Sequence, residues 1–367
     1  PKQKGLLYAG TEHGIYVSYD DGTSWSSFQK NLPIVPITDL TIKNNSLIVA
    51  TQGRSIWILD NLTVLHQLQP DSRNAQTLLF KPKESYRTKG RGGKSSLTAG
   101  TNLPNGVIVH YFLKNYDAEK DTVELQFQSE DGAVIKTYST KDKKNKLEVK
   151  AGGNEFVWDT RYDGAEKLEG MIFWSASFSG AKAVPGSYKV RLAVNGKEQT
   201  QDFTILPDPR SESSVTDMQK QFDFVNEVNQ TVDKAHKAIK NMREIRSKLK
   251  DFVKQNQSDS TATKLVAQAK TIQEDLLEVE KTLYQTQNRS NQDPLNFPIR
   301  LTNKLGHLNR LLTIDDFPPT NQDLAVKEEL TAAVEVAMER YQQLIDSDVA
   351  SFNEDFKKEK RNYLGTN

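Results

Sequence analysis

The sequence contains no cysteine, which excludes disulfide bonds, thiolate metal sites and cysteine nucleophiles. It also has almost no net charge, because 49 Lys and Arg residues balance 48 Asp and Glu residues. A balanced chain has no global field to attract nucleic acid or an anionic membrane, so we expect no nucleic-acid partner. No stretch approaches the roughly 18 apolar residues of a membrane helix, so no transmembrane segment is expected.

Motifs that carry metal or catalytic chemistry are also missing. The histidines lie far apart, without metal-binding spacing: His13, His66, His110, His236 and His307. The sequence has neither the G-x-S-x-G motif of a serine hydrolase nor the H-E-x-x-H motif of a zinc protease. The sequence therefore predicts no cofactor, no metal site and no catalytic residue.

A chain of 367 residues is long enough for two to four domains. Residues 1–69 alternate short apolar strands with Gly, Asp and Asn turns, in the segments LLYAGT, GIYVSYD, ITDLTIK, SLIVATQG and SIWILDN. LLYAGTEHGIYVSYDDG and SLIVATQGRSIWILDN align as a repeat, and several strands in about 40 residues are typical of propeller blades. We expect residues 1–69 to be the terminal blades of a β-propeller whose other blades lie upstream.

Three further regions follow. Residues 70–106 are basic and glycine-rich, and we expect a linker or a strap that is mobile or only loosely held between Lys83 and Lys94. Residues 107–209 contain about seven alternating segments, including FWSASFSG at Phe173–Gly180, and predict an immunoglobulin-like or fibronectin-like β-sandwich. The hairpin turn of this region is expected at Asn195-Gly196.

Residues 210–367 change to a helical period and predict an antiparallel bundle. Ser213 or Ser214 can cap a first helix that runs to about Asn256. A helix of this length needs a partner, which the leucine-rich stripe from Leu265 to Leu283 provides. The predicted fold is therefore multidomain: all-β, with the end of a propeller and then a sandwich, followed by an all-α bundle.

The stretch SYDDGTSW fits the Asp-box pattern at Ser18, Asp20, Gly22 and Trp25. Together with LFKPKESYR, NEFVWDTRY and VPGSYKVRL, the first 210 residues resemble the C-terminal part of sortilin-like or BNR-repeat propeller proteins. These are large exported bacterial proteins, common in Bacteroidetes, that are usually labelled glycosyl hydrolases. The resemblance implies that the box is structural: Asp20 accepts hydrogen bonds from its own turn, Gly22 is left-handed, and Trp25 is buried between strands.

Two interpretations of function remain. The preferred one is a non-catalytic binding or assembly module of a large exported or cell-surface propeller protein, which binds protein or carbohydrate through the propeller or the bundle. The alternative is the accessory C-terminal part of a glycoside hydrolase whose acids lie in upstream blades. The resemblance implies a secreted, periplasmic or outer-surface location in a Gram-negative bacterium. Weak ligand candidates are Glu12, His13 and Arg54, although Glu12 and His13 also fit a hairpin tip and Arg54 also fits a structural role between blades.

Overall fold

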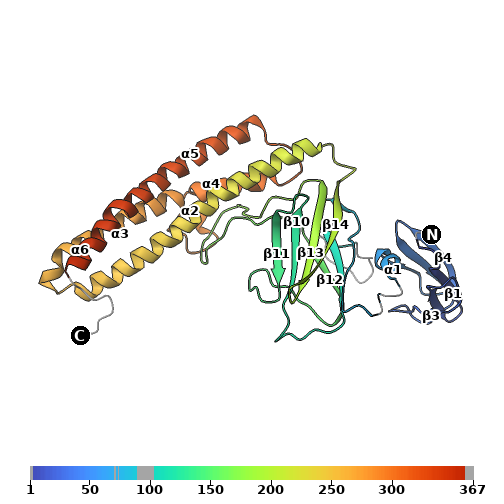
Figure 1. Cartoon of the computed structure of the whole chain (residues 1–367). Helices are drawn as coiled ribbons and strands as arrows, with labels where there is room; N and C mark the ends of the chain where they lie inside the picture. The colour runs from blue at the N-terminus through green and yellow to red at the C-terminus, as the bar shows by residue number, and fades with distance from the viewer. Residues whose placement is uncertain (1–2, 70–71, 73, 89–102, 360–367) are drawn as a thin grey trace. The chain divides into compact units, whose positions relative to one another are not determined.

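The computed structural model describes residues 3–69, 72, 74–88 and 103–359, and these divide into two compact units. The first unit is made of residues up to Thr160 together with Pro185–Pro209. The second is made of Arg161–Val184 and the residues from Arg210 onward. The fold combines mixed β-sheets with a C-terminal helical region (Figure 1).

Two small antiparallel sheets open the first unit. The first has the order β1-β2-β3 and the second has the order β4-β5-β6. Their strands are β1 (Leu7–Thr11), β2 (Gly14–Ser18), β3 (Ser26–Ser27), β4 (Ile37–Lys43), β5 (Ser46–Thr51) and β6 (Ile56–Leu59). All five strands predicted for this region are confirmed, and the β1–β2 and β5–β6 hairpins correspond to the two copies of the aligned repeat.

A shared apolar core joins these two sheets. Ile15 and Val17 of β2 and Leu47 and Val49 of β5 are buried in it. The other face of the second sheet carries Ile48, Ile56 and Ile58, because side chains alternate along each strand and Ile48 pairs with Ile58 across the ladder. Ile56 is 65% exposed and Ile58 is 58% exposed, so this face is apolar and uncovered in the described part of the chain.

Two larger sheets form the rest of the first unit. One has the order β11-β10-β13-β14-β8 and the other has the order β12-β9-β7. Their strands are β7 (Thr77–Leu79), β8 (Ser85–Arg87), β9 (Val107–Leu113), β10 (Val123–Ser129), β11 (Val134–Ser139), β12 (Gly152–Trp158), β13 (Gly186–Val194) and β14 (Lys197–Pro207). Phe127 of β10 stacks on Trp158 of β12 with ring centroids 4.4 Å apart, so the inner faces of the two sheets meet in one aromatic core.

Three predictions for these sheets have clear outcomes. The hairpin turn between β13 and β14 is confirmed, because Asn195 and Gly196 both have positive φ angles, as a type I′ turn requires. The region expected to be a linker or strap contains two strands, and Arg87 is buried, so the expectation of mobility is wrong for Ser85–Arg87. Residues 89–102 of that region lie outside the described residues.

The predicted strand at Phe173–Gly180 is wrong. Residues 161–184 form no strand and pack with the helices of the second unit, where Met171 and Ala181 are buried in the helical core. Their apolar residues alternate as they would in a strand, but several of their backbone hydrogen bonds go to residues of the helical region instead. Asn303 both accepts from the Trp174 N–H at 2.7 Å and donates to the Trp174 carbonyl at 2.8 Å.

The helices are α2 (Val215–Asn256), α3 (Thr263–Leu283), α4 (Leu301–Leu312), α5 (Asn321–Gln343) and α6 (Ala350–Lys358), while α1 (Thr63–Gln67) belongs to the first unit. A π-helical segment, Leu344–Val349, links α5 to α6. The predicted long helix and its partner are confirmed, because α2 packs on α3 (Figure 1). Ser214 caps α2 in a capping box with Asp217. No helix in the described part of the chain is long and apolar enough to span a membrane.

Candidate functional site

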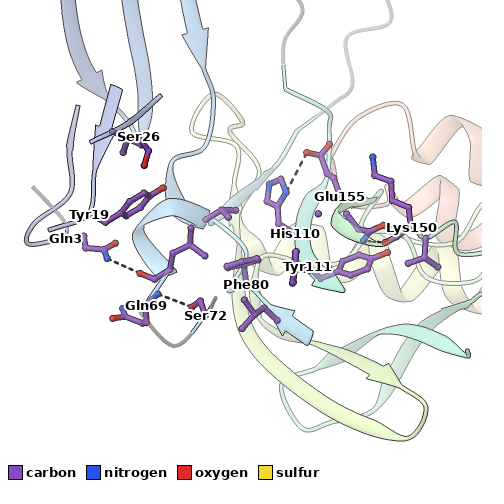
Figure 2. Close-up of a pocket in the computed structure, with 18 of the residues that line it drawn as sticks. Gln3, Tyr19, Ser26, Gln69, Ser72, Phe80, His110, Tyr111, Lys150 and Glu155 are labelled. Atoms are coloured by element: carbon purple, nitrogen blue, oxygen red, sulfur yellow. Dashed lines mark hydrogen bonds and ion pairs between the residues drawn. The ribbon is translucent and has the colours of Figure 1, made fainter. Parts of the chain in front are cut away.

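The first unit contains a hollow of about 1240 Å³ next to the Asp box. We call it the first-unit cavity. One wall comes from the three-stranded sheet β12-β9-β7, and another comes from β2 and the turn that follows it (Figure 2). Its described lining includes Tyr19, Asp20, Ser24, Gln69, Leu78, Phe80, His110, Tyr111, Phe112, Glu148, Lys150, Gly153, Asn154 and Glu155. The lining therefore combines aromatic rings with groups that donate and accept hydrogen bonds.

Strand alternation explains how β9 contributes to this wall. Val107, Val109, Tyr111 and Leu113 are buried in the core between the larger sheets, so His110 and Phe112 point to the other face. Gly153 of β12 lies directly opposite Phe112, and Leu78 of β7 is its partner on the other side. Because Gly153 has no side chain, the Phe112 ring is left uncovered on that side.

The turn of the Asp box is held together by hydrogen bonds to the Asp20 carboxylate. One carboxylate oxygen of Asp20 accepts the Ser24 N–H at 2.8 Å and the Ser18 hydroxyl at 2.8 Å, and the other accepts the Ser24 hydroxyl at 2.5 Å. Ser18 is fully buried and its Oγ also accepts the Gly22 N–H at 2.9 Å. Gly22 has a φ of +89°, a left-handed conformation that favours glycine. The expectations for Asp20 and Gly22 are therefore confirmed.

These hydrogen bonds also fix the charge of Asp20. The bonds from Ser24, and then the one from Ser18, lower the pKa of Asp20 from 3.8 to about 2. The group is therefore ionised at neutral pH and can accept hydrogen bonds, but it has no proton to give as a general acid.

The prediction that Trp25 is buried is wrong. Its side chain is 43% exposed, and its ring lies beside Gly22, within 3.8 Å of the position that a Cβ would take there. The strand after the box, β3, has two residues and both are exposed. Among the described residues, too little structure covers this side of the box to bury the indole ring.

His110 is the centre of a polar group on the wall of the cavity. Asn61 donates its Nδ2–H to His110 Nε2 at 3.1 Å. The Glu155 carboxylate lies 3.7 Å from His110 Nδ1 (Figure 2). Burial lowers the pKa of His110 from 6.5, opposed by the nearby charge of Glu155. The ring is therefore neutral at pH 7, with its proton on Nδ1 facing Glu155.

Tyr111 also belongs to the described lining, although its phenol lies on the opposite face of β9, in the core between the larger sheets. The residue is 1% exposed, and its hydroxyl has no hydrogen-bond partner in the described structure. Burial raises the pKa of Tyr111 to about 12, so the phenol stays protonated and keeps both donor and acceptor capacity.

The weak ligand candidates lie elsewhere. Glu12 and His13 are exposed in the turn between β1 and β2, as the hairpin-tip interpretation predicts. Arg54 is exposed in the turn between β5 and β6, and its carbonyl accepts the Trp57 indole N–H at 2.8 Å. None of these three residues is in the described lining of the cavity, whereas Asp20 and Ser24 of the Asp box are.

Sequence reasoning missed the residues of β9 and β12 that line the cavity. One signal was present in the strand VIVHYFL, Val107–Leu113. The side of this strand that faces away from the core carries both His110 and Phe112, and an aromatic ring is unexpected on a face that is simply solvated. No cluster of metal-ligating side chains occurs in the portion of the chain that is described. The chain matches no model of a known protein family, and it has no match among curated proteins.

Proposed function

We propose that this chain is a non-catalytic binding module of a larger exported or cell-surface protein, and that the first-unit cavity binds a carbohydrate. The observation that carries the proposal is the lining, where Phe112, Phe80 and Tyr19 lie among amide, carboxylate and ammonium groups. Sugar rings have apolar C–H faces and polar edges, so a site for them needs both kinds of surface.

A binding role is favoured over hydrolysis by the carboxylates of the lining. Glycosidases need a desolvated general acid beside a second carboxylate. Glu148 and Glu155 are exposed to solvent, and Asp20 is fixed as an anion by its own turn. The three carboxylates therefore suit the acceptance of hydrogen bonds from sugar hydroxyl groups.

The alternative is the accessory part of a glycoside hydrolase. It is favoured by one feature, the presence of Asp20, Glu148 and Glu155 in the lining of a single cavity. In that case a longer protein would turn over aryl glycosides, while this chain alone would bind sugar without cleaving it.

The apolar face at Ile48, Ile56 and Ile58 supports the larger-protein part of the proposal. Blades of a propeller pack face to face, so a neighbouring blade would cover these isoleucines. The resemblance of the Asp box and the repeat to sortilin-like propeller proteins agrees with this, and the exported, Gram-negative location rests on the same resemblance.

A glycan array screened with the purified chain, followed by calorimetry on the best glycans, tests the proposal. Phe112→Ala should weaken binding of the selected glycan by about tenfold, the effect of one lost stacking contact. Tyr86→Ala is the control, because Tyr86 is a half-exposed aromatic outside the described lining. Absence of glycan binding, or equal effects of both variants, would refute a carbohydrate site here, and turnover of aryl glycosides by this chain would refute the non-catalytic role.

A further inference from the structure

The second unit contains a separate cavity of about 560 Å³, which we call the arginine cavity. It is lined by residues of α2 and α3, by the turn after α3, and by part of the segment 161–184. The residues that matter for its chemistry are Arg243, Arg246, Glu280, Tyr284, Asn288 and Arg289.

The charge at this cavity is centred on a buried carboxylate. Glu280 is 2% exposed, and its two oxygens contact Arg243 Nε at 2.7 Å and Arg246 Nη1 at 2.5 Å. One carboxylate therefore faces two guanidinium groups. Each arginine uses one of its five N–H groups on Glu280.

The remaining N–H groups of the two arginines are available to a ligand. The side chains of Arg243 and Arg246 are 36% and 26% exposed, and the described structure records no second hydrogen bond for either. The Arg243 guanidinium also lies over the Tyr284 ring, 5.4 Å from its centroid, which holds it in place. A planar guanidinium held in this way matches a carboxylate.

Asn288 provides an independent indication of a ligand. It is 6% exposed, and its side-chain oxygen is buried without a hydrogen-bond partner in the described structure. A buried amide oxygen with no partner is unfavourable, so it calls for an explanation such as a bound ligand. Asn288 is also one of the residues that line the cavity.

A purely structural role for these residues does not account for the arginines that face the cavity. A buried carboxylate that only stabilises a bundle needs its charge paired and its hydrogen bonds satisfied, and nothing more. Here the carboxylate is buried, but the cationic side of the triad opens onto a cavity, and Arg289 adds a third guanidinium. Arg289 is held in place by donating to the carbonyls of Thr286 and Asn288 at 2.9 and 3.1 Å.

We propose that the arginine cavity binds a small organic carboxylate that carries a hydroxyl or amide group close to its charged end. The carboxylate accepts hydrogen bonds from N–H groups of Arg243 and Arg246, and the neighbouring polar group pairs with the Asn288 amide. The lining carries three arginines and Lys281 against Glu280 and Glu169, and this excess of positive charge selects an anion. The position of Asn288 selects a ligand with a second polar group.

The test uses calorimetry on the full chain with N-acetylglycine, which has a carboxylate next to an amide. N-acetylglycinamide is its neutral counterpart, acetate lacks the second polar group, and none of the three is a sugar. We expect saturable binding of N-acetylglycine at millimolar or lower concentration, and at least about tenfold weaker binding of the other two, the value of one charge-assisted hydrogen bond.

Two variants and a matched control assign the site. Arg246→Gln and Asn288→Ala should each weaken the binding of N-acetylglycine by about tenfold or more, and Asn288→Ala should leave the binding of acetate unchanged. Arg340→Gln should change nothing, because Arg340 is an arginine of the same unit that pairs with Asp275 outside the cavity. Circular dichroism establishes that each variant is folded, and Asn288→Ala provides the test if Arg246→Gln unfolds.

Three outcomes would overturn the proposal. They are no binding of N-acetylglycine, equal binding of its neutral amide, and binding that the Arg246 and Asn288 variants leave unchanged. A glycan in the first-unit cavity would not affect these results, so the two sites can fail separately.

Discussion

Asp20 shows how one side chain fixes a turn. Its carboxylate accepts three hydrogen bonds within the Asp box, and these lower its pKa to about 2. A carboxyl group with a lowered folded-state pKa contributes stability above its ordinary pKa of 3.8, and this stability is lost as the pH falls toward 2. The contribution is therefore fully present at neutral pH.

We predict that Asp20→Asn lowers the melting temperature of the first unit at pH 7, because an amide offers one acceptor oxygen in place of two. Asp21→Asn is the matched control, since it removes the same charge one residue later and asparagine tolerates the positive φ of +59° at that position. Calorimetric melting curves of both variants decide the matter. Equal melting temperatures would show that the box bonds do not stabilise the unit.

Glu280 allows a second comparison between two glutamates of one helix. Glu280 is buried between two arginines, whereas Glu278 is 69% exposed and pairs with Lys281. Glu280→Gln should lower the free energy of unfolding by about 1 to 3 kcal/mol, because two charge-assisted bonds are lost. Glu278→Gln should change it by about 0.5 kcal/mol or less. Urea unfolding followed at 222 nm measures both, and similar values would argue against a desolvated triad.

At the scale of elements, the segment 161–184 is held by polar side chains of the helices. Asn229 donates to the Ser179 carbonyl at 2.9 Å, and Asn303 bonds both backbone groups of Trp174. We predict that Asn303→Leu costs about 1 to 3 kcal/mol, because it leaves the Trp174 backbone groups without partners. Hydrogen exchange should speed up in residues 161–184. Lys304→Leu, at the exposed neighbouring position on α4, should leave exchange there unchanged.

His236 makes the same contact region sensitive to pH. It is fully buried, its Nδ1 contacts the Glu166 carbonyl at 2.5 Å, and its Nε2 has no partner in the described structure. Burial lowers its pKa from 6.5, opposed chiefly by the Glu166 carbonyl and Asp233, while Arg243 acts with the burial. Because the folded state favours the neutral ring, His236 contributes its full stability to the fold above pH 6.5. This contribution is lost as the pH falls below 6.5 and the ring must take up a proton.

We therefore predict that the helical melting temperature falls between about pH 7.5 and about pH 5 more in the wild type than in His236→Gln, which cannot titrate. The signal at 222 nm reports the helices. His13→Gln, at the exposed β1–β2 turn, should keep the wild-type pH dependence. The same slope in wild type and His236→Gln would contradict a role for this ring.

The elements differ in how well sequence patterns predict them. The α2 helix could be predicted because its cap, Ser214, and its apolar period are local features. The segment 161–184 could not, because its partners Asn229 and Asn303 lie 50 and 129 residues away along the chain. The short strand β8 was missed because it is defined by pairing with β14, more than a hundred residues later. The first-unit cavity was missed for the same reason, since it joins the Asp-box turn to β9 and β12.

At the scale of the whole molecule, the helical unit is assembled from two separate parts of the chain. Residues 161–184 contribute Met171 and Ala181 to the helical core, with Phe173 and Phe178 packed against it. The Phe178 ring approaches Gly306 so closely that a Cβ there would lie 2.5 Å from its Cε1 atom. A bundle cut at Ser211 therefore keeps its helices but loses part of its core.

We predict that a fragment of residues 211–359 is helical yet melts at a lower temperature than the helical unit of the full chain, because removing residues 161–184 exposes apolar surface and leaves Asn229 and Asn303 without those partners. A synthetic peptide of residues 161–184 added to the fragment should raise its melting temperature, since a ligand that binds the folded state stabilises it. A peptide with Phe178→Ala should do so less, because it lacks the ring that packs on Gly306. Melting at the full-chain temperature without the peptide would show that the helices are sufficient by themselves, and a random-coil spectrum would show that residues 161–184 are required for the bundle to fold at all.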